Sequence, residues 1–119
     1  MTLVFVYGTL KRHGSNHRFL AGQEFIDDAQ TTHGYILYAL GDYPGMVRSK
    51  NAGDFVTGEI WNVDDNCLAQ LDALEGIDEG LYARESVELA PPFHAQKVQT
   101  YIYLRSVEGR QTVGPTWGV

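Results

Sequence analysis

Apolar residues gather in short runs that glycine, proline and polar residues separate, a pattern typical of a strand-rich fold. The Val- and Phe-rich residues 3–7 predict a buried strand that ends at Tyr7, where Gly8 and Thr9 break the pattern. The same reasoning predicts five further strands, at residues 24–29, 32–39, 56–63, 82–89 and 97–104. Gly58 lies inside one of them, where a glycine often marks a β-bulge or the close approach of another backbone.

Helical periodicity is clear in one stretch only. Residues 65–75 space their apolar side chains by three and four positions, which predicts an amphipathic helix. Asp64 or Asp65 is suited to cap its start, and Gly76 is suited to end it. A second, short helix is predicted at residues 15–20. The turn-rich residues 41–45 and the tail from residue 109 show no strong period.

These elements predict one α+β domain that spans residues 1–119. Two domains in a chain of 119 residues would each have too small a core. Connections short enough for antiparallel pairing favour a small mixed sheet, curled or barrel-like, with one main helix and one or two short helices. Strand–helix alternation and a glycine-rich phosphate loop are both missing, so a doubly wound nucleotide-binding fold is not expected.

Glu75 has the position in the predicted helix that most needs an explanation. At about 100° per residue, Leu68, Leu71 and Leu74 define one helix face, and Glu75 points about 40° from its centre at Leu71. A carboxylate aimed at the core is costly when unpaired, and the macrodipole at the helix end adds to that cost. Both effects predict a raised pKa suited to proton transfer, so Glu75 is the candidate catalytic residue. The alternative is a boundary glutamate that reaches solvent or pairs with Arg84.

The second candidate is the turn Tyr7-Gly8-Thr9-Leu10 that follows the first strand. Consecutive backbone N–H groups in such a turn can bind a carboxylate or an oxyanion, and Gly8 would let a ligand approach closely. Asn16 follows soon after in the sequence and could support the turn. Tyr82 and Arg84 share a strand face by the period of two, so they could line one pocket wall. The alternative is an ordinary strand-ending turn.

Composition and charge exclude several classes of protein. A net charge of −6 argues against non-specific nucleic-acid binding, which needs basic surface. No apolar run approaches the roughly 18–20 residues of a membrane span, and no signal-peptide pattern is present, so a cytoplasmic protein is expected. Cys67 is the single cysteine, so no internal disulfide can form. It lies within the predicted helix and is expected to be a small packing residue rather than a nucleophile. The four histidines have no ligand spacing, so no metal site is expected.

Five groups of motifs occur in one order along nearly the whole chain. They are Val4-Phe5-Val6-Tyr7-Gly8-Thr9-Leu10 followed by Asn16-His17-Arg18, then Tyr43-Pro44, Gly58-Glu59-Ile60-Trp61, Leu71-Asp72-Ala73-Leu74-Glu75 and Tyr82-Ala83-Arg84. In this order they resemble the γ-glutamyl cyclotransferase superfamily, in particular its γ-glutamylamine cyclotransferase and AIG2-like branch. Each motif alone is weak evidence, whereas the ordered set is specific.

The resemblance implies a compact mixed barrel around a cavity. It also implies an enzyme that converts the γ-glutamyl group of a small γ-glutamyl amine or peptide into 5-oxoproline and releases the free amine, without a metal or organic cofactor. Glu75 matches the catalytic carboxylate of the family. The residues matched to binding of the glutamyl portion are Tyr7, Gly8, Thr9 and Leu10, and those expected to line the pocket are Asn16, Tyr43, Tyr82 and Arg84.

The sequence leaves the leaving amine and the oligomeric state open. A non-catalytic small-ligand-binding or regulatory protein on the same fold is an alternative, because function belongs to the site rather than to the fold. A second alternative is cyclotransfer from a γ-glutamylated carrier protein or antibiotic precursor.

Overall fold

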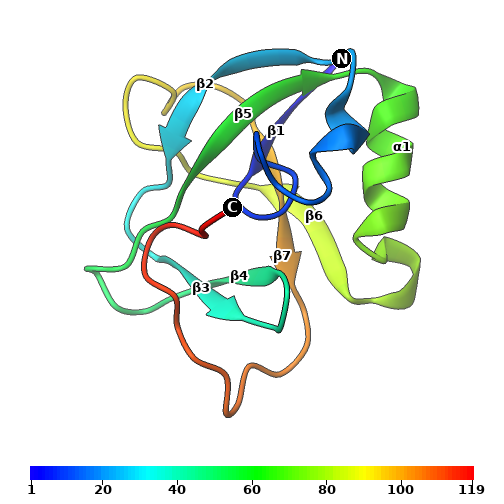
Figure 1. The fold of residues 1–119 in the computed structure, drawn as a ribbon. Coiled ribbons are helices and arrows are strands. Elements are labelled where there is room, and N and C mark those ends of the chain that lie inside the picture. Colours follow the sequence, from blue (N-terminus) through cyan, green and yellow to red (C-terminus); the bar gives the residue numbers. More distant parts are fainter.

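Seven strands of the computed structural model, which describes residues 1–119, form one mixed sheet beside a single main helix (Figure 1). The strands are β1 (Thr2–Val6), β2 (Glu24–Gln30), β3 (Tyr35–Ala39), β4 (Pro44–Arg48), β5 (Thr57–Val63), β6 (Tyr82–Ser86) and β7 (Gln99–Tyr103). The helices are the 3-10 helix η1 (His17–Leu20), the α-helix α1 (Asp65–Leu74) and the 3-10 helix η2 (Ile77–Glu79). The predicted α+β class, with one main and two short helices, is confirmed.

The sheet is open, so the expectation of a barrel is wrong. Its strand order is β2-β5-β1-β7-β4-β3, with β6 paired to β7 beside this path, and the end strands β2 and β3 do not pair with each other. The tail contains Gly109, Gly114 and Pro115, has no alternating pattern, and forms only one isolated bridge, between Tyr38 and Thr112. No further strand is therefore available to close the sheet.

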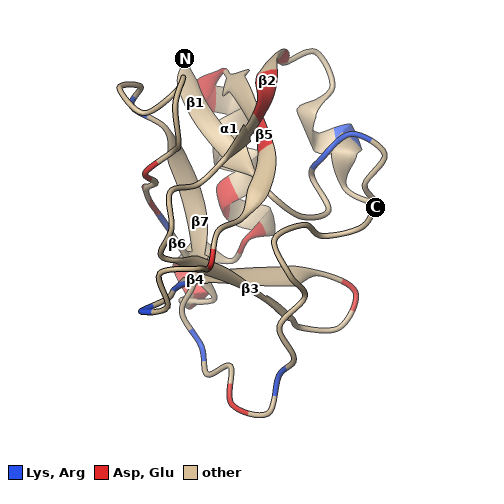
Figure 2. Ribbon diagram, turned by 90° about the vertical axis from the view of Figure 1, so that its left-hand side faces the viewer, with Lys and Arg blue, Asp and Glu red and all other residues tan.

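The two ends of the sheet differ in character. At one end β2 pairs only with β5, carries a register shift between Phe25 and Asp27, and is largely exposed. Its acidic residues are visible on the ribbon in Figure 2 and are Glu24, Asp27 and Asp28. At the other end the tail covers β3, because Ala39 N–H donates to the Gln111 carbonyl and Val113 N–H donates to the Leu37 carbonyl.

The strand predictions hold in the interior of each strand and differ at the ends. β3 begins at Tyr35 rather than at residue 32, and β6 ends at Ser86 rather than at residue 89. The sequence pattern does not predict β4, because its first residue, Pro44, reads as part of a turn. Proline has no N–H for the sheet and is tolerated at the first position of a strand. The close approach expected at Gly58 is confirmed, since a Cβ there would lie 2.4 Å from the Val6 carbonyl oxygen.

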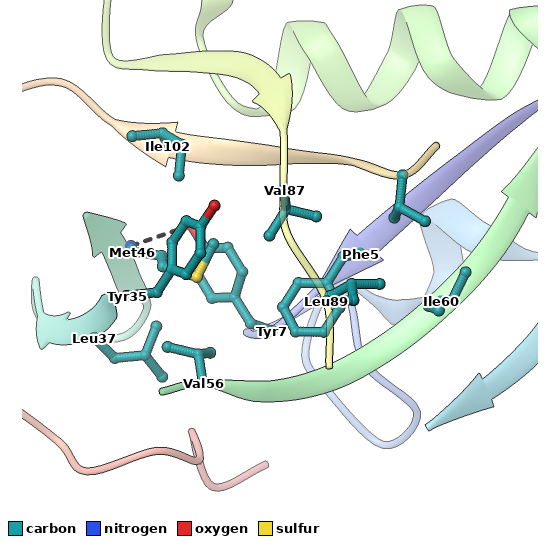
Figure 3. Close-up of a cluster of buried hydrophobic side chains, with 11 residues drawn as sticks. Phe5, Tyr7, Tyr35, Leu37, Met46, Val56, Ile60, Val87, Leu89 and Ile102 are labelled. Carbon is teal, nitrogen blue, oxygen red and sulfur yellow. Dashed lines mark hydrogen bonds between the residues drawn. The ribbon is translucent and has the colours of Figure 1, made fainter. Parts of the chain in front are cut away.

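Alternation along the strands divides the core between the two faces of the sheet. On β1, Val4 and Val6 face the cluster that α1 covers, together with Leu71 of the helix. Phe5 on β1 and the following Tyr7 face the opposite cluster, which Figure 3 shows around β3, β4 and β5. The strand that carries the candidate turn is thus packed on both sides.

Helix α1 is held at both ends as the sequence indicates. The Asp64 carboxylate caps its start by accepting the Cys67 N–H at 2.7 Å, and Gly76 ends it in the left-handed region at φ 65°. Cys67 and Leu71 are buried against the sheet, which confirms the packing position predicted for the cysteine. No helix of the chain combines the length and the apolar character needed to cross a membrane.

Candidate active site

A cavity of about 330 Å³ lies beside the turn that follows β1. Its walls come from β1 and its turn, the 42–44 segment, the C-terminal end of α1, the start of β6 and one residue of β7. The structure brings together here nearly every residue singled out in the sequence: Tyr7, Gly8, Thr9, Leu10, Asn16, Tyr43, Glu75 and Tyr82.

The turn contains backbone N–H groups that bind no acceptor in the protein, in residues that line the cavity. Asn16, which also lines the cavity, holds the turn at Thr9: its N–H donates to the Thr9 carbonyl at 2.9 Å and its side-chain amide donates to the Thr9 hydroxyl at 3.0 Å. The Gly8 carbonyl accepts the Lys11 N–H at 3.2 Å. By contrast, the N–H groups of Gly8, Thr9 and Leu10 have no acceptor within the protein. Three consecutive donors in lining residues suit a carboxylate or an oxyanion.

Packing gives Gly8 a second reason to be glycine. A Cβ at this position would lie 2.7 Å from Cγ of Pro44, closer than real side chains approach. The turn therefore rests directly on the ring that begins β4. Glycine at position 8 therefore serves two purposes: it lets a ligand approach the backbone, and it leaves room for the Pro44 ring. The sequence alone indicates only the approach of a ligand.

Glu75 lies at the C-cap of α1 and reaches the cavity. Its N–H donates to the Leu71 carbonyl at 2.9 Å, and the left-handed Gly76 then turns the chain away. The Glu75 carboxyl group makes no hydrogen bond or ion pair with any protein group, and it borders the cavity. Burial raises its pKa from 4.5 to about 7. A partly protonated carboxyl near neutral pH is suited to accept and return a proton.

Tyrosine hydroxyls fix the walls around this carboxyl group. Tyr7 donates to the Tyr101 carbonyl at 2.6 Å and accepts the Met46 N–H at 3.2 Å, a contact drawn in Figure 3. Tyr82 donates to the Pro44 carbonyl at 2.8 Å. Burial raises the pKa of both hydroxyls, so both stay neutral and act as rigid supports. Tyr43, by contrast, is 39% exposed at the cavity mouth.

Arg84 does not line the cavity, which corrects the expectation that it shares a pocket wall with Tyr82. Its Nε atom lies 3.4 Å from an Asp72 carboxylate oxygen on α1. The same carboxylate accepts the Tyr101 hydroxyl at 2.8 Å. The residue that Arg84 pairs with is thus Asp72 and not Glu75, because Asp72 lies on the helix side that faces β6 and β7.

Further residues line the cavity without having been expected in the site: Phe5, Val6, Ser15, Asp42, Pro44, Leu74, Leu81 and Tyr101. Strand alternation could have placed Tyr101 on the α1 side of β7, whereas Asp42 comes from a turn without any period. The lining contains two carboxylic acids, Asp42 and Glu75, and no lysine, arginine or histidine. No group of three or more His, Cys, Asp or Glu side chains is arranged to hold a metal ion.

Comparisons with known proteins match this architecture. Residues 4–117 match the family model described as gamma-glutamyl cyclotransferase, AIG2-like. A Vibrio cholerae protein is 42% identical over 101 residues, which cover 85% of this chain and 81% of that protein. Gamma-glutamylaminecyclotransferase A of Danio rerio is 41% identical over 93 residues, 72% of this chain and 57% of that protein. The solution structure of Escherichia coli protein ytfP superposes with a TM-score of 0.74 at 32% identity, covering 99% and 96% of the two chains.

Proposed function

The chain belongs to the gamma-glutamyl cyclotransferase, AIG2-like family, and on that premise we propose that it converts a γ-glutamyl amine or peptide into 5-oxoproline and the free amine. The observation that carries the proposal is Glu75, a carboxyl group at a helix end that makes no hydrogen bond or ion pair with the protein and reaches the cavity. The cytoplasmic location expected from the sequence belongs to the same proposal, as does independence from a cofactor.

Glu75 would act as the proton carrier. Its ionised carboxylate takes a proton from the α-ammonium group of the substrate, and the freed amine attacks the γ-carbonyl carbon of the same molecule. The new ring C–N bond forms, Glu75 gives its proton to the leaving nitrogen, and the C–N bond to that nitrogen breaks. Glu75, ionised again, then takes the second surplus proton from the ring nitrogen and passes it to the freed amine, which leaves as an ammonium ion. The Glu75 pKa of about 7 lets the carboxyl group both accept and return protons near neutral pH.

The free N–H groups of Gly8, Thr9 and Leu10 supply the complementary part of the site. They would bind the α-carboxylate of the substrate or polarise the carbonyl oxygen that becomes negative during ring closure. In comparable sites one such donor is worth roughly 3–4 kcal/mol in the transition state. The lining offers no basic side chain for either role, so backbone donors carry it. Because the attack is intramolecular, holding the folded substrate supplies much of the acceleration.

The direct test is release of 5-oxoproline from a panel of γ-glutamyl amines and γ-glutamyl dipeptides. The wild-type protein is expected to release it from at least one of them. Glu75→Gln should fold and lose about 10²–10⁴ of the turnover, the usual contribution of a general base. Glu108→Gln, an exposed carboxylate remote from the cavity lining, is the matched control and should keep full turnover.

Two results would contradict the proposal. Unchanged turnover in Glu75→Gln would show that Glu75 does not carry the proton. Thermal stabilisation of the wild type by 5-oxoproline or a γ-glutamyl amine, without product from any substrate, would instead favour a ligand-binding protein on this fold.

A further inference from the structure

Lys11, the residue directly after the candidate turn, is buried although it carries a charge. Only 7% of the residue is exposed, and burial lowers the pKa of its ammonium group. Nearby Glu59 is already engaged: it accepts the Arg12 N–H at 3.1 Å and the Trp61 indole N–H at 3.0 Å, and pairs with the Arg12 guanidinium at 3.1 Å. Lys11 makes no ion pair of its own.

The only hydrogen bond of the Lys11 ammonium group goes to the tail. Its Nζ donates to the backbone carbonyl of Trp117 at 2.6 Å, across 106 positions of sequence. Two further contacts hold the tail near Trp117. Thr57 N–H donates to the Pro115 carbonyl at 2.8 Å, and the Trp117 side chain packs against the core cluster of Figure 3.

The backbone of Lys11 is hydrogen-bonded to the turn and to the segment that follows it. Its N–H donates to the Gly8 carbonyl at 3.2 Å and its carbonyl accepts the Gly14 N–H at 2.8 Å. Asn16 braces the opposite side of the turn at Thr9. The Lys11 side chain therefore links the turn to the backbone of the tail at Trp117.

We infer that Lys11 is a positioning residue, which holds the turn Gly8–Leu10 in place through its bond to the Trp117 carbonyl. A buried charge without an ion-pair partner costs folding free energy, a cost that an apolar side chain of similar length would avoid. What methionine cannot replace is the directed bond to the tail. The expected effect of Lys11 on turnover rests on the proposed function. The expected effect of Lys11 on the rigidity of the turn does not.

Amide hydrogen exchange tests the mechanical part. In Lys11→Met, the Gly14 and Asn16 amide hydrogens, whose bonds close the turn, should exchange about 10-fold faster relative to the Glu75 amide of α1. In the control Thr57→Val, which removes the hydroxyl contact between Thr57 and Thr116 of the tail and keeps the bond from the Thr57 N–H to the Pro115 carbonyl, the same ratio should stay within about two-fold of the wild type.

Catalysis provides the second readout. Lys11→Met should lower kcat/KM by about 10-fold because the turn donors are displaced, while the pH midpoint of kcat/KM stays that of the wild type, since Glu75 is untouched. Lys11→Arg keeps a charged donor and should restore most of the exchange protection. If Lys11→Met does not fold, Lys11→Gln carries the same comparison.

Unchanged exchange at Gly14 and Asn16 in Lys11→Met would overturn the inference. So would equal loosening in Thr57→Val, because the effect would then not be specific to the bond of Lys11. If the wild type releases no 5-oxoproline from any substrate, the proposed function fails, but the exchange comparison still decides whether Lys11 holds the turn.

Discussion

Replacing Glu75 with glutamine should make the protein more stable above neutral pH while removing most of its activity. Burial places the pKa of Glu75 at about 7 in the folded protein, against 4.5 for an exposed glutamate. Below about pH 4.5 the group is protonated in both states and costs nothing. As the pH rises from there to about 7 the folded state resists ionisation, so stability falls, and above 7 the loss is complete.

The size of the effect follows from those two pKa values. Each pKa unit corresponds to about 1.4 kcal/mol, so ionised Glu75 destabilises the folded state by about 3 kcal/mol above pH 7. Glutamine has nearly the same shape and cannot ionise, so Glu75→Gln should recover this amount. In a domain of this size the gain corresponds to a rise in Tm of roughly 10 °C.

Urea unfolding at about pH 5 and about pH 8.5 measures the difference. Wild type and Glu75→Gln should differ by less than about 1 kcal/mol at the lower pH and by about 3 kcal/mol at the higher one. Glu108→Gln, which removes an exposed carboxylate, should follow the wild type at both. Equal stability of wild type and Glu75→Gln at the higher pH would show that the carboxylate ionises without penalty, and the account of its pKa would be refuted.

Three further outcomes are expected. The kcat/KM of the wild type should rise with pH and level off above about pH 7, because Glu75 must be ionised to accept the proton; a profile flat from pH 5 to 9 would contradict this role. Gly8→Ala should lower the free energy of unfolding by about 1–3 kcal/mol, since its Cβ would meet the Pro44 ring at 2.7 Å, and should raise KM; urea unfolding and steady-state kinetics measure the two effects. Tyr7→Phe should destabilise the fold by about 1–3 kcal/mol in urea because two buried backbone groups lose their hydroxyl partner, and a stability equal to wild type would be the contrary result.

Local rules account for the parts of the molecule that the sequence predicts well. The helix 65–74 follows from a 3.6-residue period, an aspartate cap and Gly76, all of which lie in the helix or directly beside its ends. The same period places Glu75 beside the apolar face without any knowledge of the sheet. Strand interiors are equally readable, because alternation is a property of consecutive residues.

Contacts between distant segments account for what the sequence does not predict. β4 begins with Pro44, and its place in the sheet depends on β3 and on a single parallel bridge from Met46 to Ile102 of β7. The tail has no period because it is held by separate bonds to several elements rather than by a ladder. The ion pair between Arg84 and Asp72 is likewise not predictable from the sequence, because it depends on how α1 packs on β6.

The open sheet also has a consequence for how copies of the chain meet one another. An unpaired strand is a template to which a strand of a second molecule can add. β2 counters this with Glu24, Asp27 and Asp28 and with its bulge, which repel and misalign an incoming strand. β3 has no such charges and depends on the cover provided by Gln111 and Val113. Loss of the tail would therefore expose β3 as the strand at which copies first aggregate.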